Sequence, residues 1–315
     1  MMYLMIVVLF SPLFCPASAP SPADKEGVAH EGKTTQLVIP KNPLATGAVK
    51  FESIKPKEFV NWNSDDHLES FDLMQRVLLI CKEKEVTGYL IYGGESTDSK
   101  STFSWEIVPH PKGSWLLGKQ LRVLWNIMFG APSILKQERE QLAEHLRQEL
   151  KLFPHNENEP SPCLHKDDVF CDQNVIKKEA IFEGKQINVL CSRYNPHDKV
   201  HFLLAPKNHR DGFSDLSESE YLEVMQLSQK IISFYKNKGY EEAHILHKTG
   251  ATAGQIIPHW ICQVILLPTK VQGFFSKLFL SKSLMMGSSP LSEEMFQHRV
   301  ACFREELGEV LLGQG

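Results

Sequence analysis

Residues 200–209 read VHFLLAPKNH, and residues 250–263 read GATAGQIIPHWICQ. The first stretch is an apolar run of the kind that forms a buried strand, and it ends in a Pro-Lys turn. Ser217 and Glu220 then have the spacing of a capping box, which predicts a long amphipathic helix ending near Lys238. The second stretch starts as a glycine-rich turn and continues as an apolar strand. This order of strand, helix and strand predicts an α+β unit.

Further short strands are predicted on both sides of this helix. They share apolar sequences bounded by turn residues, and with the two above they cover 180–182, 187–191, 201–205, 243–246 and 260–267. Three strands before the helix and two after it predict one antiparallel sheet with flanking helices.

The two quoted stretches resemble, in order and spacing, the motifs of the HIT-like (histidine-triad) superfamily of nucleotide-binding proteins. Pro206 to His209 resembles the Pro-Lys-x-His turn of that family, and Gly254 with Gln255 resembles its glycine-glutamine approach to the triad strand. The resemblance covers residues 166–270 and implies a HIT-like antiparallel sheet. It also implies that the partner is a nucleotide or another phosphorylated small molecule.

The triad positions of this resemblance are His259, Ile261 and Gln263. Residues two apart in a strand point to the same face, so these three are expected to face the phosphate together. In the family, the histidine at the middle position attacks the α-phosphorus and forms a covalent nucleotidyl-imidazole. Ile261 has no lone pair to donate, so the triad is degenerate and this route is absent. His259 resembles the histidine that braces the nucleophile, and Gln263 resembles the last position of the transferase and phosphorylase branches.

The resemblance also assigns ligand-binding positions. Arg193 stands where the family usually has a ribose-binding aspartate, and Lys248 stands where it has an asparagine near the phosphate. The two cations suit an altered anion pocket, and the alternative is that both are solvated surface side chains. His201 matches a family histidine near the base, or else serves the core. The candidate ligand-binding residues are His259, Gln263, Gln255, Lys248, Arg193 and His201.

Three functions stay open at this point. The preferred one is a degenerate HIT-like protein that binds a nucleotide or another phosphate-bearing ligand without hydrolysing it by the family route. The second is an active nucleotidyl transferase or hydrolase with a displaced nucleophile, for which His247 and His259 are the candidates. The third is a structural or interaction module that binds no ligand. The sequence determines neither the ligand nor the oligomeric state.

The first half of the chain resembles the second in sequence and in the order of its predicted elements. A helix over 66–84 precedes strands over 87–92 and 103–108, and a further helix covers 134–153. The segment 37–43, LVIPKNP, resembles the segment that ends in the Pro-Lys turn of the second half.

The clearest similarity between the two halves is a pair of tryptophans. Trp260 follows Trp105 at an offset of 155 (260 against 105), and the same offset relates the strand that starts at Tyr89 to the strand that starts at His244. One interpretation is a second HIT-like unit over 37–153, in a tandem protein similar in plan to hexose-1-phosphate uridylyltransferases and dinucleoside tetraphosphate phosphorylases. The other is an unrelated N-terminal extension. Ser104 and Glu106 take the triad places in the first half, so it has no triad either.

The seven cysteines are odd in number and scattered, which indicates buried reduced thiols rather than a disulfide framework. Cys163, His165 and Cys171 lie near a point where some relatives hold a structural metal. They include no Cys-x2-Cys pair and lack a fourth ligand, so no metal and no cofactor are expected. Cys171 is expected to pack in the core and His209 to anchor its turn.

The remaining segments are predicted to connect or extend these units. Residues 1–23 contain an apolar run and an Ala-Ser-Ala motif, which indicate a signal peptide or an apolar tail. Residues 24–36 and 154–165 have the composition of linkers, and 271–315 is expected to be a C-terminal helical extension. The protein is secreted or periplasmic if the signal is real, and otherwise cytoplasmic. The net charge of −4 shows no basic patterning for nucleic acid, and no segment is long enough to span a membrane.

Overall fold

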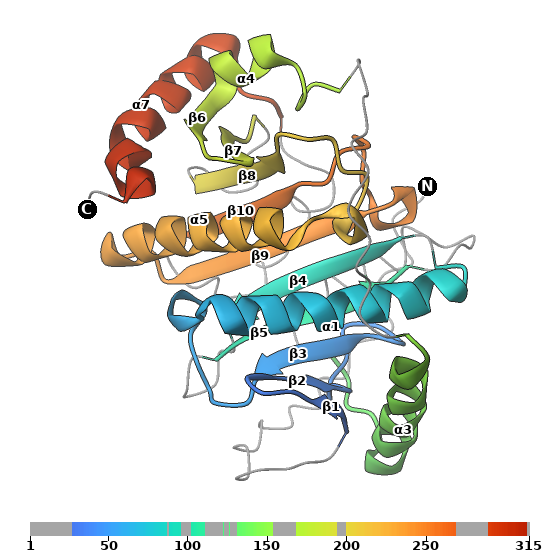
Figure 1. Ribbon diagram of the computed structural model, residues 1–315. Helices are drawn as coiled ribbons and strands as arrows, with labels where there is room; N and C mark the ends of the chain where they lie inside the picture. Colours follow the sequence, from blue (N-terminus) through green and yellow to red (C-terminus); the bar gives the residue numbers. More distant parts are fainter. Residues whose placement is uncertain are drawn as a thin grey trace, which may run out of the picture.

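The computed structural model describes residues 27–86, 88–95, 102–110, 122, 126, 131–153, 168–193, 200–268 and 289–313. Within these residues, ten strands form one antiparallel sheet in the order β1-β2-β3-β5-β4-β9-β10-β8-β7-β6 (Figure 1). The strands are β1 (Val28–Glu31), β2 (Thr35–Val38), β3 (Val49–Ser53), β4 (Tyr89–Glu95), β5 (Phe103–Pro109), β6 (Ala180–Glu183), β7 (Ile187–Cys191), β8 (Val200–Pro206), β9 (Glu242–Thr249) and β10 (Cys262–Leu267).

Helices pack against this sheet, as the expected α+β class requires. α1 and α5 run side by side across one face of the sheet (Figure 1). The helices are α1 (Ser64–Glu83), α3 (Lys136–Leu152), α4 (Gln173–Glu179), α5 (Glu218–Asn237) and α7 (Glu293–Leu312), with 3-10 turns η1 (Phe59–Asn61), η2 (Phe213–Asp215) and η3 (Ala251–Ala253). The predicted α+β class, an antiparallel sheet with flanking helices, is confirmed.

The two halves of the sheet have the same plan. β1, β2, β3, α1, β4 and β5 follow one another as β6, β7, β8, α5, β9 and β10 do, and the strand order is mirrored about the β4–β9 junction. Each 20-residue helix begins at a capping box, formed by Asn63 with Asp66 in α1 and by Ser217 with Glu220 in α5. The predicted start of α5 is therefore confirmed.

Reciprocal hydrogen bonds join the halves. The amide of Gln75 in α1 donates to the carbonyl of Phe213 at 3.1 Å, in the 3-10 turn before α5. The amide of Gln229 in α5 donates to the carbonyls of Phe59 at 2.7 Å and of Trp62 at 2.8 Å, around the turn before α1. Gln75 and Gln229 are 154 residues apart, as are Phe59 and Phe213, so each helix holds the turn that leads into the other.

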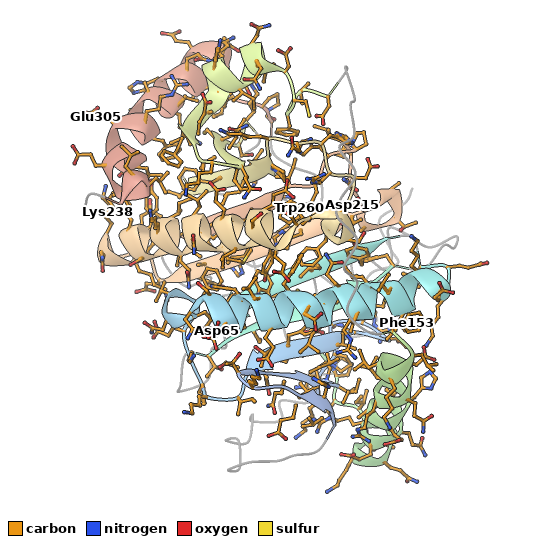
Figure 2. All side chains as sticks on the ribbon, viewed as in Figure 1. Asp65, Phe153, Asp215, Lys238, Trp260 and Glu305 are labelled. Atoms are coloured by element: carbon orange, nitrogen blue, oxygen red, sulfur yellow. The ribbon has the colours of Figure 1, made fainter. Side chains whose placement is uncertain are left out.

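A histidine occupies the centre of the junction. His247 stacks between Trp105 at 5.6 Å and Trp260 at 4.9 Å, and it pairs with Ile91 across the β4–β9 ladder. This face carries the main core beneath α1 and α5, which the side chains fill in Figure 2, whereas Leu246 belongs to a separate cluster on the opposite face. The offset of 155 for β4 and β9 is therefore wrong, because it matches Ile91 with Leu246 across the pleat. An offset of 156 (247 against 91) keeps both residues on one face.

Helices cover both edges of the sheet. α3 packs on β1, where Glu140 accepts a hydrogen bond from the backbone of Gly27 at 2.6 Å. α7 packs on β6, where Arg304 donates to the carbonyl of Ala180 at 2.8 Å (Figure 1). Covered edges have no free row of backbone groups for another chain to pair with.

Several boundaries differ from those expected. β1 lies inside the segment 24–36, which was expected to be a linker, because Ala29 is buried and α3 covers this edge. Residues 37 and 38 are the end of β2, which corresponds to β7 in the strand order, so the match of 37–43 to the Pro-Lys stretch of β8 is wrong. β10 begins at Cys262 rather than at residue 260. The α7 helix lies in the expected extension 271–315, while residues 1–23 and 154–165 lie outside the described residues.

We predict that stability falls as the pH drops below about 6.5, through His67 and His247. Burial lowers the pKa of His67 to about 4 and that of His247 to about 3, from 6.5 in the unfolded chain. The stabilisation is complete above pH 6.5 and is lost as the pH falls toward these values, because only the unfolded chain takes up the protons. Each histidine contributes up to about 1.4 kcal/mol per pH unit.

Urea unfolding between pH 7.5 and 5 measures this slope. His67→Phe should flatten it, while replacing the exposed His298 of α7 by alanine should leave it unchanged. A slope equal in wild type and His67→Phe would contradict the assignment.

Candidate functional site

His259 lies three residues before β10, in the loop that leads into this strand. Its ring is buried, with 1% of its surface exposed, and its Nδ1 atom contacts the carboxylate of Asp168. Its Nε2 atom lies 3.1 Å from the carbonyl oxygen of Pro206, at the end of β8. Because His259 precedes the strand, strand alternation alone does not assign its face, and the shared face of positions 259, 261 and 263 stays a prediction.

Four potential metal ligands meet at this point. The donor atoms of Asp168, Cys171, His209 and His259 all lie within 4.8 Å of one another. Oδ2 of Asp168 lies 2.6 Å from Nδ1 of His209 and 3.4 Å from the sulfur of Cys171. The backbone amide of Phe170 donates to the other carboxylate oxygen at 2.9 Å, which orients Oδ2 toward the cluster. We call these four residues the donor cluster.

The outer contacts of both histidines suit rings that carry a proton on Nε2 and bind a metal through Nδ1. Nε2 of His209 lies 3.0 Å from a carboxylate oxygen of Asp211, and Nε2 of His259 faces the carbonyl of Pro206. Both partners accept hydrogen bonds, so each Nε2 atom can donate to its partner, and Nδ1 is the ring atom left to bind a metal. Without a metal, the Asp168 carboxylate accepts hydrogen bonds from the Nδ1 atoms. With a metal bound, the Nδ1 lone pairs, the carboxylate and the thiol can all point at the ion. This donor set therefore fits a metal ion.

Ionisation in the donor cluster follows from burial and hydrogen bonding. Burial lowers the pKa of His259, which opposes a second proton on its ring. Burial also acts to raise the pKa of Asp168, but hydrogen bonds from His259, the Phe170 amide and His209 outweigh it and lower this pKa. Asp168 is consequently a carboxylate at neutral pH, as metal coordination requires.

The sequence analysis did not predict most of the donor cluster. Cys171 was taken as a core thiol and His209 as a turn anchor, while Asp168 was not singled out. Cys163 and His165, which the sequence set beside Cys171, lie outside the described residues. The available signal was the Asp-x2-Cys spacing of residues 168 and 171 ahead of the histidine of the Pro-Lys turn.

Three predicted ligand-binding residues do share a sheet face. His201 pairs with Ile265, Gln263 pairs with Leu246, and Lys248 follows Leu246 by two positions. Ile265 and Leu246 belong to the cluster on the face opposite α1 and α5. Paired residues in antiparallel strands point to one side, so His201, Gln263 and Lys248 all point to this face. Burial lowers the pKa of the Lys248 amine.

Arg193 and Gln255 have other contacts. Arg193 forms an ion pair with Glu293 of α7 and lies 3.7 Å from Glu179, with its guanidinium 4.7 Å above the ring of Phe296. The side chain of Gln255 accepts from the amide of Gly250 at 2.6 Å and donates to backbone carbonyls, so it holds a turn together. These contacts do not place Arg193 or Gln255 on the sheet face that carries Lys248.

Ile261 packs among apolar side chains. It lies against a cluster formed by Phe170, Ile176, Ala180, Leu190 and Ala205, which links α4 to β6, β7 and β8. At the triad position, this residue therefore serves packing.

His247 is not placed to act as a displaced nucleophile. Its ring is 1% exposed and is covered by tryptophan on both sides, on the face beneath α1 and α5. A group that attacks phosphorus in line must come within about 3–3.5 Å of it, which this enclosure does not allow.

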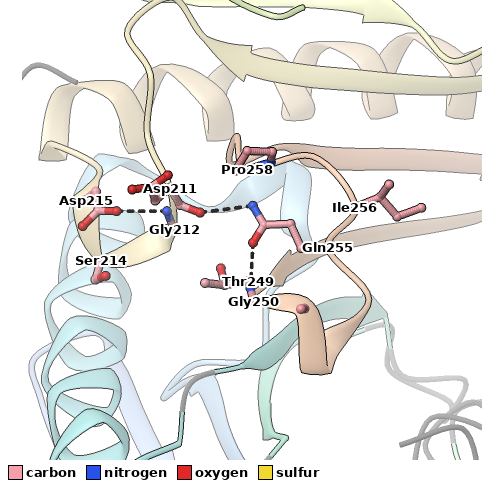
Figure 3. A pocket seen from close by; sticks show the side chains of 10 residues that line it. Asp211, Gly212, Ser214, Asp215, Thr249, Gly250, Gln255, Ile256 and Pro258 are labelled. Atoms are coloured by element: carbon pink, nitrogen blue, oxygen red, sulfur yellow. Dashed lines mark hydrogen bonds between the residues drawn. The ribbon is translucent and has the colours of Figure 1, made fainter. Parts of the chain in front are cut away.

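An open pocket of about 450 Å³ lies beside the donor cluster (Figure 3). The described residues that line it include the carboxylates of Asp211 and Asp215 and no lysine, arginine or histidine. Gln255 bridges Asp211 and Gly250 across it, as the dashed lines of Figure 3 show. A pocket with carboxylates and no cation disfavours a phosphate group. Its lining residues are Asp211, Gly212, Ser214, Asp215, Thr249, Gly250, Ala251, Gln255, Ile256 and Pro258.

Among the described residues, no helix combines the length and the apolar character that crossing a membrane requires.

Comparisons with known proteins agree on the family. Residues 173–260 match the HIT domain family profile. An uncharacterised HIT-like protein of Methanocaldococcus jannaschii is 25% identical over 93 residues, which are 29% of this chain and 71% of that protein. The resemblance derived from the sequence motifs is thereby confirmed.

Solved structures extend the likeness of fold over both halves. A GalT-like protein of Arabidopsis thaliana has a TM-score of 0.51 at 10% identity, covering 86% of this chain and 84% of its own. An Arabidopsis thaliana ADP-glucose phosphorylase, solved with ADP-glucose bound, has a TM-score of 0.50 at 11% identity, covering 85% and 81%. A uridylyltransferase has a TM-score of 0.50 at 10% identity, covering 95% of each chain.

We predict that Ile261→Ala lowers the free energy of unfolding by about 2 kcal/mol, since it removes a packed but only half-buried side chain. Urea denaturation measures this loss. The matched control is Ile256→Ala, whose side chain is 94% exposed and should change stability by less than about 0.5 kcal/mol. Equal effects of the two substitutions would contradict the packing role.

Proposed function

We propose that this chain, a member of the HIT-like superfamily, binds a nucleotide or another phosphate-bearing small molecule without hydrolysing it through a nucleotidyl-histidine. The binding surface is the face of β8, β10 and β9 that points away from α1 and α5. The observation that carries the proposal is the placement of Lys248, Gln263 and His201 on that face.

The position of Lys248 supports a phosphate as the bound group. His247 and Cys262 form the last pair of the β9–β10 ladder, and one further step in the same register brings Lys248 opposite Ile261. In the family, the residue at the place of Ile261 meets the phosphate. An ammonium group there supplies a charge-assisted hydrogen bond to an anion. The Arabidopsis thaliana phosphorylase of the same fold, solved with ADP-glucose, makes nucleotide sugars the first ligands to test.

Ile261 and its surroundings argue against the family chemistry. Isoleucine offers no lone pair, His247 is enclosed by two tryptophans, and both ring nitrogens of His259 face other groups of the protein. Neither His247 nor His259, the two candidates from the sequence, is therefore placed to act as a displaced nucleophile. A module without ligand is the remaining alternative, and a binding measurement separates it from the proposal.

We expect Lys248→Met to weaken the binding of ADP-glucose or UDP-glucose at least about tenfold, the effect of removing one charge-assisted hydrogen bond. Isothermal titration calorimetry of the full chain measures the affinity. Lys185→Met is the matched control, because Lys185 is exposed in the β6–β7 turn, away from this face. The proposal fails if the wild type binds neither nucleotide sugars, nucleotides nor dinucleoside polyphosphates.

We further expect no covalent nucleotidyl-enzyme when the wild type is incubated with a dinucleoside polyphosphate or a nucleoside phosphoramidate. Loss of a nucleophile costs several powers of ten in rate, at about 1.4 kcal/mol of barrier for each tenfold. Intact-protein mass spectrometry detects such an adduct. An adduct that maps to this face, with turnover abolished by substituting the modified residue, would promote the displaced-nucleophile alternative.

A second proposed function is the binding of one metal ion by the donor cluster. Two imidazole nitrogens, a thiol and a carboxylate are four ligands of the types that Zn²⁺ takes in tetrahedral sites. Asp168, Cys171, His209 and His259 would hold the ion. When bound, it would cross-link the segment before α4 to the ends of β8 and of the loop before β10, a structural role.

We expect the purified chain to carry about one zinc ion, and chelation to lower its melting temperature, because a structural metal contributes binding free energy to folding. Cys171→Ser should lose the metal. Cys302→Ser is the control, since this thiol is exposed on α7. Metal analysis with differential scanning fluorimetry tests both, and equal metal content in the two variants would refute the site.

A further inference from the structure

Asp211 is the charged neighbour of the donor cluster. It follows β8 by five residues, and its Oδ1 atom lies 3.0 Å from Nε2 of His209. Its side chain is 65% exposed, whereas the ring of His209 is fully buried. The carboxylate therefore reaches from the pocket of Figure 3 to the outer nitrogen of a cluster histidine.

The backbone of Asp211 is fixed independently of its side chain. Its carbonyl oxygen accepts a hydrogen bond from the amide of Gln255 at 3.1 Å, and Gln255 also binds Gly250 and the carbonyl of His259. The loop that carries Asp211 is therefore tied to the loop that carries the second cluster histidine. A change confined to the carboxylate leaves these backbone contacts in place.

The two cluster histidines differ in their outer partner. His259 donates from Nε2 to a neutral backbone carbonyl, that of Pro206, and His209 donates from Nε2 to a carboxylate. A carboxylate behind an imidazole fixes the tautomer and raises the basicity of the opposite nitrogen. The Nδ1 atom of His209 faces the cluster, where Asp168 lies at 2.6 Å, so with a metal bound it is this nitrogen that gains basicity.

We infer that Asp211 is a positioning residue for the donor cluster: it holds His209 with its proton on Nε2 and so directs the Nδ1 lone pair at the metal position. This inference rests on the proposed metal site. Asp211 does not touch the ion, and its effect passes through the imidazole. Because the carboxylate also lines the pocket, the affinity for the metal depends on a group that solvent and solutes can reach.

Titration of Co²⁺ or Zn²⁺ into the metal-free full chain, in competition with a chromophoric chelator at fixed pH, tests this inference. Asp211→Ala should weaken metal binding about 10- to 100-fold. Asp211→Asn should have a smaller effect, because its amide oxygen still accepts from Nε2 but carries no charge. Asp215→Asn is the matched control. It lines the same pocket, and its carboxylate accepts from Gly212 at 3.0 Å rather than from the cluster, so it should leave metal affinity unchanged.

A second readout separates positioning from a general structural effect. In the Co²⁺-loaded protein, the thiolate-to-cobalt absorption band should persist in both Asp211 variants, because the four ligands are unchanged. The melting temperature of the metal-free Asp211→Asn variant should equal that of wild type. If Asp211→Ala fails to fold, the comparison of Asp211→Asn with Asp215→Asn decides.

The outcomes for the two proposals are distinct. If wild type and Cys171→Ser bind the metal alike, the metal site itself is refuted. If wild type binds and Cys171→Ser does not, but both Asp211 variants match Asp215→Asn, the site stands and the role of Asp211 is overturned.

Discussion

The contact between α1 and α5 across the β4–β9 junction is the constraint on which the rest of the structure depends. Gln75 and Gln229 each hold the turn that leads into the opposite helix, and Phe71 stacks on Tyr221 at 4.5 Å between the two helices. Beneath them, His247 is enclosed by Trp105 and Trp260. Either half alone would expose this surface, so ten strands form one sheet instead of two separate sheets.

The same junction determines which face of the sheet is left for a ligand. α1 and α5 bury one face with the main core, and a second cluster of buried residues lies on the other face, where the proposed binding residues point. Strand alternation makes this division strict, since a shift of one residue moves a side chain to the other face. Lys248 and His247 are neighbours in sequence, yet one belongs to the proposed phosphate surface and the other to the core.

The donor cluster lies where the segment before α4 meets the loops that follow β8 and precede β10. His259 is the triad position with a histidine, but its contacts with Asp168 and Pro206 direct both ring nitrogens into the protein. Ile261 packs beneath α4. The triad region thus combines a metal-type cluster and an apolar contact. This combination agrees with the proposal of a binding protein without the family nucleophile.

The sequence by itself determined the local features. The capping box at Ser217, the strands of the second half and the absence of a nucleophile at Ile261 follow from short-range spacing and side-chain chemistry, which tertiary structure does not alter. The tertiary structure decided what depends on distant segments: the place of β1 on an edge covered by α3, and the convergence of Asp168 on His209 and His259. These ligands are 41 and 91 residues apart from Asp168 along the chain. Periodicity describes only neighbouring residues, so no local pattern could bring the three together.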